Sequence, residues 1–272
     1  MNGENMTEVV AGAPPLGNIR TAVFDLDGVV YIEGHGIDGA GDALQRIDDA
    51  GITVLFASNN STKTPLTAAT HIAAATGYRC RAEQVVTSSL VTSRTIAGSY
   101  RRAYVVGETG LSETLESEGL DVVKDWRDAD VVVVGLDRNV TFDRLAGATL
   151  AIATGGAAFV ATNTDASFPT QEGPVPGGGA LVGAIAIATG VEPQVFGKPN
   201  EVFRAFIKDM AHGDVVMVGD RPETDLAMGK AEGWVTVLVM SGVTTDASSV
   251  DPAYLPDHVV DSIAAVPGLM GL

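Results

Sequence analysis

The chain has 272 residues, of which 46% are hydrophobic, enough to bury one large core or two modest ones. Its formal net charge of −17 disfavours nucleic acid and anionic membranes as partners. No apolar run is long enough to span a membrane, which argues against a transmembrane helix. A single cysteine, Cys80, excludes an intrachain disulfide, which fits a reducing cytoplasm.

Residues 1–17 lack the basic and apolar regions of a secretory signal, and we expect them to form a loose extension. Valine-rich stretches beyond them are typical of strands in a parallel sheet covered by helices; they lie at residues 21–24, 53–58, 103–108, 130–136, 158–163, 214–220 and 235–240. Apolar periodicity and end signals predict helices at residues 40–50, 65–76, 177–190 and 201–210. The Gly/Pro-rich segment 172–180 reads as a loop into a helix. This alternation predicts a doubly wound α/β fold.

Polar residues follow the predicted strands at the points where these strands end. Asp25 and Asp27 follow the first strand, where Gly28 lets the chain turn away, and Asp220 ends the strand at 214–220. Ser58 ends the second strand, and Lys198 stands just before a helix. A parallel sheet would gather these groups at one edge. Several carboxylates there require a cation, and oxygen-only ligands favour Mg²⁺.

Four segments, DLDGVVY, ASNNS, GKPN and GDRPETD, stand in this order along the chain. The set resembles the four motifs of the haloacid dehalogenase (HAD) superfamily of phosphohydrolases. The long insert between the second and third motifs resembles the α/β cap of the type IIA, NagD-like and p-nitrophenylphosphatase-like branch. The resemblance implies a Rossmann-like HAD core, made of residues 1–87 and 193–272, and an inserted α/β cap domain, residues 88–192.

The same resemblance implies a role for each motif residue. Asp25 would be the nucleophile that forms an aspartyl phosphate, and Asp27 the general acid and base. The Asp25 carboxylate, the Asp27 backbone carbonyl and Asp220 would hold Mg²⁺. Ser58 would hydrogen-bond the transferring phosphoryl group, and Lys198 would neutralise charge between it and the nucleophile.

The remaining site residues are expected around this centre. Asp225 starts the helix after Asp220 and is expected behind the metal ligands rather than among them. Asn59 and Asn60 follow Ser58 and are expected to contact substrate. Phe168 lies in a cap loop that, by resemblance, faces the site and influences specificity; an ordinary core phenylalanine is the alternative for this residue.

Together these features predict a Mg²⁺-dependent phosphatase that hydrolyses small phosphomonoesters. Nucleoside monophosphates, sugar phosphates and, in vitro, p-nitrophenyl phosphate are the expected substrates. The partner is thus a small phosphorylated metabolite, with no nucleic acid and no membrane. Caps of this branch often mediate dimers, so a homodimer through the cap is also expected. Two alternatives remain open: a phospho-acceptor switch and a catalytically silent metabolite-binding protein.

Overall fold

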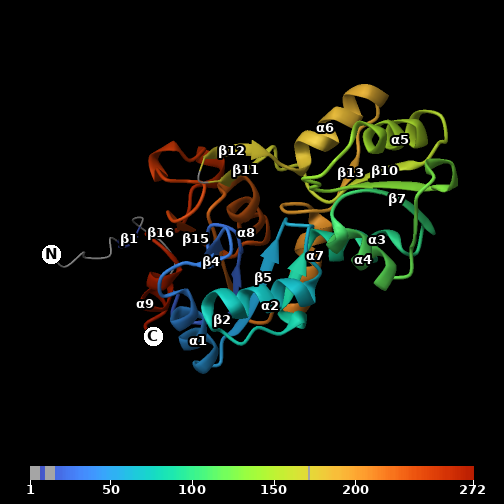
Figure 1. The fold of residues 1–272 in the computed structure, drawn as a ribbon. Coiled ribbons are helices and arrows are strands. Elements are labelled where there is room, and N and C mark those ends of the chain that lie inside the picture. Colours follow the sequence, from blue (N-terminus) through green and yellow to red (C-terminus); the bar gives the residue numbers. More distant parts are fainter. Residues whose placement is uncertain (1–6, 10–15, 171) are drawn as a thin grey trace. The chain divides into compact units, whose positions relative to one another are not determined.

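The computed structural model describes residues 7–9, 16–170 and 172–272, and the chain forms two compact units (Figure 1). The core unit comprises Met1–Ala57, Ala68–Val86 and Arg204–Leu272, and the inserted unit comprises Ser58–Thr67 and Thr87–Phe203. These units are defined by packing between residues, and such a division does not test where a domain begins or ends. The domain boundaries expected after residues 87 and 192 therefore stay a prediction.

The core unit is built on a seven-stranded sheet with the strand order β1-β16-β15-β14-β2-β5-β6. Its strands are β1 (Thr7–Val9), β2 (Ile19–Phe24), β5 (Thr53–Ser58), β6 (Val85–Thr87), β14 (Asp214–Gly219), β15 (Val235–Val239) and β16 (His258–Val260). The pairs β16–β15, β15–β14, β14–β2 and β2–β5 are all parallel. Within the expected loose extension, residues 7–9 instead form an edge strand antiparallel to β16, whereas residues 1–6 and 10–15 lie outside the described residues.

Helices cover both faces of this sheet. One face carries Phe24, Phe56 and Val218 and packs against α1 (Ala40–Asp49), α2 (Pro65–Thr76) and the C-terminal α9 (Val266–Leu269). The opposite face carries Met217, against which Gly229 of α8 (Ala227–Glu232) lies. Adjacent residues of a strand point to opposite faces, so valine-rich strands with no polar face are what a doubly covered sheet requires.

The helix-start signals act as the sequence predicts. The backbone N–H of Thr67 donates to the Thr64 hydroxyl oxygen at 3.1 Å, which caps α2 at its predicted first residue. Helix α7 (Glu201–Met210) begins behind Asn200, whose side-chain oxygen accepts from the N–H of Val202 at 2.9 Å. Helix α2 is confirmed with the bounds predicted from Pro65 and Gly77, and α7 is confirmed as the helix predicted to follow Asn200.

The inserted unit has its own parallel sheet, with the strand order β13-β10-β9-β7-β8. Its strands are β7 (Arg102–Val106), β8 (Asp121–Val123), β9 (Val131–Val134), β10 (Ala158–Ala161) and β13 (Gln194–Val195). Helices α5 (Phe142–Ala153) and α6 (Gly178–Thr189) pack on one face, and α4 (Thr109–Ser117) contacts β7 and β8 and packs against α3 (Ser88–Ile96). The fold class is therefore confirmed as α/β with doubly wound parallel sheets.

Two short hairpins complete the chain. Strands β3 (Tyr31–Ile32) and β4 (His35–Gly36) pair antiparallel, as do β11 (Ser167–Thr170) and β12 (Gly173–Pro176). The expectation of a loop at residues 172–180 is wrong for its first part. Prolines Pro174 and Pro176 fit β12 because a two-stranded ribbon has two edges, and an edge strand tolerates missing N–H donors.

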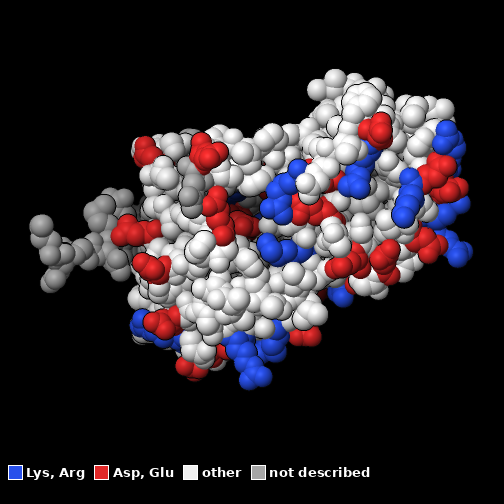
Figure 2. All heavy atoms as spheres, viewed as in Figure 1, with Lys and Arg blue, Asp and Glu red and all other residues white. Residues whose placement is uncertain are grey.

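Charged side chains of both signs are interspersed over the face of the molecule seen in Figure 2. Within the part of the chain that the structure describes, no helix has the length and apolar character needed to cross a membrane.

The connectivity of the core sheet determines where a ligand can bind. From β2 the chain continues to β5 on one side, while β14 lies on the other side. Strand order reverses at this point, and ligands of open α/β sheets bind in the crevice at the carboxyl ends of strands at such a switch point. Asp25 follows β2 and Asp220 follows β14.

Candidate active site

The loop after β2 buries Asp25 and exposes Asp27. The backbone N–H of Asp25 donates to the carbonyl of Val218 at 2.9 Å, which extends the β2–β14 pairing by one residue. Asp25 is 7% exposed, whereas the Asp27 side chain is exposed to solvent. The end of β2 thus buries the Asp25 carboxylate, and the turn that follows exposes that of Asp27.

Gly28 makes this turn possible. Its φ is +92°, a conformation that side chains with a Cβ disfavour, and its N–H donates to the Tyr31 carbonyl at 2.9 Å. A Cβ atom at position 28 would also stand 2.4 Å from Oδ2 of Asp220. The glycine after the two aspartates is therefore required both by backbone conformation and by the close approach of Asp220.

Three carboxylates converge at the switch point. Asp25, Asp220 and Asp225 each offer an oxygen atom, and these atoms all lie within 4.8 Å of one another. Asp220 and Asp225 have no exposed surface. Three carboxylates that were all ionised at this distance would repel strongly, because the low dielectric of the interior would not screen them. A donor set of buried carboxylate oxygens fits a hard divalent cation.

Backbone amides hold two of these carboxylates in place. Oδ2 of Asp220 accepts from the N–H of Val243 at 2.7 Å, and Oδ2 of Asp225 accepts from the N–H of Arg221 at 3.1 Å. A short π-helical turn, Pro222–Leu226, carries Asp225 back toward the end of β14. Asp225, which is expected behind the metal ligands, thus lies in the same cluster as Asp25 and Asp220.

Tyr31 is a buried side chain near Asp25 and Asp27. It is 2% exposed and meets the ring of His71 edge-on, with 4.8 Å between ring centroids. Burial, and then the negative charges of Asp27 and Asp25, raise the pKa of Tyr31 well above its ordinary value. Tyr31 therefore stays neutral across the physiological pH range.

A second group of predicted residues comes together in the inserted unit. The side-chain oxygen of Asn59 accepts from the backbone N–H of Lys198 at 2.7 Å, and its amide nitrogen donates to the Lys198 carbonyl at 3.3 Å and to Oδ1 of Asp165 at 3.1 Å. Asn163 donates to the Asn59 carbonyl at 2.7 Å. Both Asn59 and Lys198 are buried. Asn59 therefore holds the backbone of Lys198 in place. The sequence predicts a contact of Asn59 with substrate and does not predict this contact with Lys198.

Ser58 and Asn60 shape the turn around Asn59. The Ser58 hydroxyl oxygen accepts from the N–H of Asn60 at 3.1 Å, and the Asn60 side-chain oxygen accepts from both the N–H and the hydroxyl of Thr62 at 2.9 and 2.7 Å. Such contacts are typical of side chains that stabilise tight turns. Phe168 is half-buried on β11, where it pairs with Val175 of the β11–β12 hairpin.

Sequence reasoning missed several residues that hold these groups. Asn163 and Asp165 follow β10, so their position after a strand end was a usable signal. Val243 acts through its backbone, which leaves no trace in the side-chain pattern. The structure thus brings Asp25, Asp220 and Asp225 together in the core unit and brings Asn59 and Lys198 together in the inserted unit.

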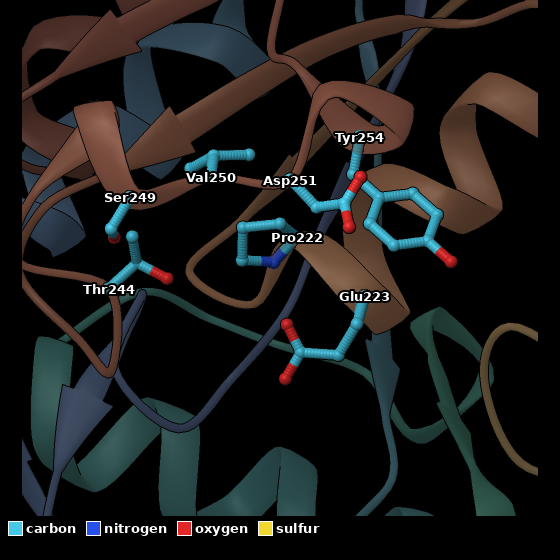
Figure 3. A pocket seen from close by; sticks show the side chains of 7 residues that line it. All are labelled: Pro222, Glu223, Thr244, Ser249, Val250, Asp251 and Tyr254. Carbon is cyan, nitrogen blue, oxygen red and sulfur yellow. The ribbon is translucent and has the colours of Figure 1, made fainter.

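A pocket of about 370 Å³ opens next to the loop that follows Asp220 (Figure 3). It is lined by Pro222, Glu223, Thr244, Ser249, Val250, Asp251 and Tyr254. Glu223 and Asp251 are both exposed carboxylates, and they would repel a phosphate dianion. The pocket is therefore unsuited to the phosphoryl group of a substrate.

Comparison with known proteins identifies the family of this chain. A family model described as haloacid dehalogenase-like hydrolase matches residues 22–121, and a second, described as HAD-hydrolase-like, matches residues 195–266. An acid sugar phosphatase from Staphylococcus saprophyticus is 39% identical over 87% of this chain and 94% of its own length. The 5′-nucleotidase YutF from Bacillus subtilis is 36% identical over 89% of this chain and 94% of its own length.

Solved structures show the same fold. The p-nitrophenyl phosphatase from Archaeoglobus fulgidus superposes with a TM-score of 0.83 at 31% identity, covering 94% of this chain and all of its own. A glycerol phosphate phosphatase from Mycobacterium tuberculosis, solved in complex with magnesium, gives 0.81 at 31% identity and covers 90% of this chain and 76% of its own. The chain belongs to the haloacid dehalogenase-like hydrolases and is a phosphatase of that family.

Proposed function

We propose that this protein is a Mg²⁺-dependent phosphomonoesterase that works through an aspartyl phosphate on Asp25. The convergence of the Asp25, Asp220 and Asp225 carboxylates at the switch point of the core sheet carries this proposal. A phosphate dianion could not approach three buried carboxylates unless a cation neutralised them. The magnesium complex of a relative supports Mg²⁺ as that cation.

Asp25 and Asp27 divide the chemistry between them. A carboxylate is ionised at neutral pH, so Asp25 attacks phosphorus without a separate base. The oxygen of the leaving alcohol departs and takes a proton from Asp27. Asp27 later removes a proton from the water that hydrolyses the aspartyl phosphate. The exposure of Asp27 beside buried Asp25 supports this division, because only an accessible group can exchange protons with a leaving group and with water.

The metal site would consist of the Asp25 carboxylate, the Asp27 backbone carbonyl and Asp220, with Asp225 behind them. When bound, Mg²⁺ neutralises the carboxylates and the transferring phosphoryl group. The chain's own part is to hold the oxygens in place, and the amides of Val243 and Arg221 already hold Asp220 and Asp225.

Further roles are proposed for Ser58 and Lys198. Ser58 hydrogen-bonds the phosphoryl group, and Lys198 neutralises its charge. The contacts of Asn59 with Lys198 support a positioning role for Asn59 in addition to the expected substrate contact. Asn60 and Phe168 are proposed to contact the leaving group of the substrate.

Small phosphorylated metabolites are the proposed substrates. The names of the relatives support sugar phosphates, glycerol phosphate and nucleoside monophosphates, with p-nitrophenyl phosphate as a laboratory substrate. None of these relatives is named as a phospho-acceptor switch or as a silent binding protein. The single cysteine supports a cytoplasmic location.

A homodimer through the inserted unit is proposed as well. Phe142 and Ile187, which are 84% and 87% exposed, lie on the adjacent helices α5 and α6 of that unit and support an apolar contact there. Sedimentation of the wild-type protein and of a Phe142→Ser, Ile187→Ser variant tests this. We expect a dimer that the variant disrupts, and a monomeric wild-type protein would contradict it.

The catalytic proposal is tested with a panel of phosphomonoesters. Sugar phosphates, glycerol phosphate, nucleoside monophosphates and p-nitrophenyl phosphate are assayed with Mg²⁺, after EDTA, and after Mg²⁺ is restored. We expect turnover that EDTA abolishes and Mg²⁺ recovers. Asp220→Asn should lose turnover over the whole panel, while the exposed Asp209→Asn on α7 serves as the matched control. Full turnover by metal-free protein would overturn the metal site.

A further inference from the structure

After β15 and Met240, the chain continues as Ser241–Thr244. These four residues contact the turn after Asp27 and the end of β14 at Asp220, which we call the two loops of the acidic cluster Asp25, Asp220 and Asp225. We call Ser241–Thr244 the β15 loop. The Ser241 hydroxyl donates to the carbonyl of Gly28 at 2.7 Å. The N–H of Val243 donates to Oδ2 of Asp220 at 2.7 Å, and that of Thr244 to the Asp220 backbone carbonyl at 3.3 Å. Hydrogen bonds from one short segment therefore link the turn after β2 to the end of β14.

Gly242 allows this segment to lie directly against Asp220. A Cβ atom at position 242 would stand 2.0 Å from Oδ2 of Asp220 and 2.6 Å from its Cβ. On the other side, a Cβ atom at Gly28 would stand 2.9 Å from the Cα of Gly242. Because φ of Gly242 is not positive, space alone requires a glycine there. The packing around Asp220 is thus too close for any side chain on the β15 loop at this point.

We propose that Ser241, Gly242 and Val243 are positioning residues of the metal site. The amide of Val243 fixes one oxygen of Asp220 and so sets the plane of the whole carboxylate. The Ser241 hydroxyl fixes the carbonyl of Gly28, and with it the path of the turn that carries the Asp27 carbonyl. This inference rests on the proposed Mg²⁺ site and adds to it residues that lie outside the four motifs.

Electrostatic repulsion explains why the carboxylates of the metal site need positioning residues. The carboxylates of Asp25, Asp220 and Asp225 have oxygens within 4.8 Å of one another, so in metal-free protein they would lower their energy by rotating apart. A carboxylate already held by a backbone amide does not have to be reoriented when the cation binds. Preorganisation of this kind raises affinity because less ordering remains to be done on binding.

Binding of Mg²⁺ to metal-free full-length protein, followed by isothermal titration calorimetry, tests the proposal without relying on activity. Gly242→Ala should weaken Mg²⁺ binding by about 10–100-fold, the range typical for groups that orient metal ligands. Gly268→Ala is the matched control, because a Cβ at position 268 meets nothing within 4 Å. Ser241→Ala should weaken binding by about 10-fold, and Ser241→Thr, which keeps the hydroxyl, should restore most of it.

The backbone contribution is tested at position 243. Val243→Pro removes the N–H that Asp220 accepts, whereas Val243→Ala keeps it, so the alanine variant should bind Mg²⁺ more tightly than the proline variant. In turnover assays, the Mg²⁺ concentration for half-maximal rate should rise by the same factor as the dissociation constant. The KM for substrate at saturating Mg²⁺ should stay close to the wild-type value.

The outcomes separate this inference from the function on which it rests. Wild-type affinity for Mg²⁺ in folded Gly242→Ala and Ser241→Ala proteins would overturn the role of the β15 loop and leave the phosphatase proposal intact. If Gly242→Ala fails to fold, the comparison of Ser241→Ala with Ser241→Thr decides. Failure of the wild-type protein to bind Mg²⁺ would overturn the metal site itself and, with it, this inference.

Discussion

The backbone N–H of Asp25 donates to the carbonyl of Val218 at 2.9 Å, one step beyond the register pair formed by Phe24 and Val218. Strands β2 and β14 therefore end together, and the residues that follow each of them, Asp25 and Asp220, must lie side by side. The position of two acidic residues far apart in the sequence is thus a consequence of strand register. The chemistry proposed for the site depends on this relationship.

The first prediction separates Asp27 from Asp25. Asp27→Asn should slow phosphoryl transfer from alkyl phosphates more than from p-nitrophenyl phosphate, because nitrophenolate is a good leaving group without protonation. General acid catalysis is typically worth ~10²–10⁴-fold, so the difference between the two substrates should be large. Rapid-quench single-turnover assays measure release of the leaving group. An equal loss for both substrates would remove Asp27 from the acid role.

The second prediction concerns Asn59. Asn59→Ala removes the acceptor for the Lys198 N–H and the donors to the Lys198 carbonyl and Asp165, in a buried setting. Leaving a buried polar group without its partner costs about 1–3 kcal/mol, so the melting temperature should fall. Activity should fall as Lys198 loses its fixed position. Thermal unfolding and steady-state assays provide the two measurements.

Asn60→Ala is the comparison variant for Asn59→Ala, because it removes the turn contacts with Thr62 and leaves the contacts of Asn59 with Lys198 in place. It should lower activity less than Asn59→Ala does. Comparable losses in the two variants would show that the segment matters as a turn and that Asn59 has no special relation to Lys198.

How far the sequence predicts the structure depends on the range of the interactions involved. Strands and helices follow from local patterns, so β2, β5, β14 and β15 appear where valine-rich runs predict them. The neighbours Asp25 and Asp220 follow from the parallel sheet together with strand ends. The short distance from Asp225 to Asp25 and Asp220 also depends on the π-helical turn Pro222–Leu226. No sequence pattern predicts that turn.

Most of the features that sequence reasoning missed depend on contacts between distant segments, and β12 is a local exception. The β15 loop contacts the acidic residues through backbone amides, a glycine and the Ser241 hydroxyl, and none of these has a recognisable pattern in the sequence. Strand β12 escapes prediction because Pro174 and Pro176 are turn signals in most settings. Edge strand β1 depends on β16, which lies at the opposite end of the sequence.

The third prediction concerns the pH dependence of stability. The Arg138 guanidinium forms a fork with Glu108, at 2.6 and 2.8 Å, and hydrogen bonding to it lowers the pKa of Glu108 below its ordinary value. The folded state thus loses this proton at a lower pH than the unfolded state does. The pair therefore stabilises the protein above the unfolded pKa, and this stabilisation is lost as pH falls through the lowered folded pKa.

Glu108→Gln should accordingly lower the melting temperature at pH 7, by an amount that shrinks as the pH falls below 4.5, the ordinary pKa of glutamate. Arg138 is largely exposed, so the expected loss is small, about 0.2–1 kcal/mol. Glu116→Gln, an exposed position on α4, is the matched control and should change little. Thermal unfolding of the three proteins across this pH range is the measurement, and a difference that does not depend on pH would refute the account.

The central claim is that Asp25 carries the phosphoryl group during turnover. The most direct measurement is mass spectrometry of peptides from Asp27→Asn protein, quenched in acid during reaction with p-nitrophenyl phosphate and Mg²⁺, since slower hydrolysis of the intermediate should let it accumulate. We predict a phosphoryl adduct on Asp25, and its absence from Asp25→Asn, Asp27→Asn protein that retains the wild-type circular dichroism spectrum. An adduct on another residue, or turnover by well-folded Asp25→Asn protein, would contradict the account.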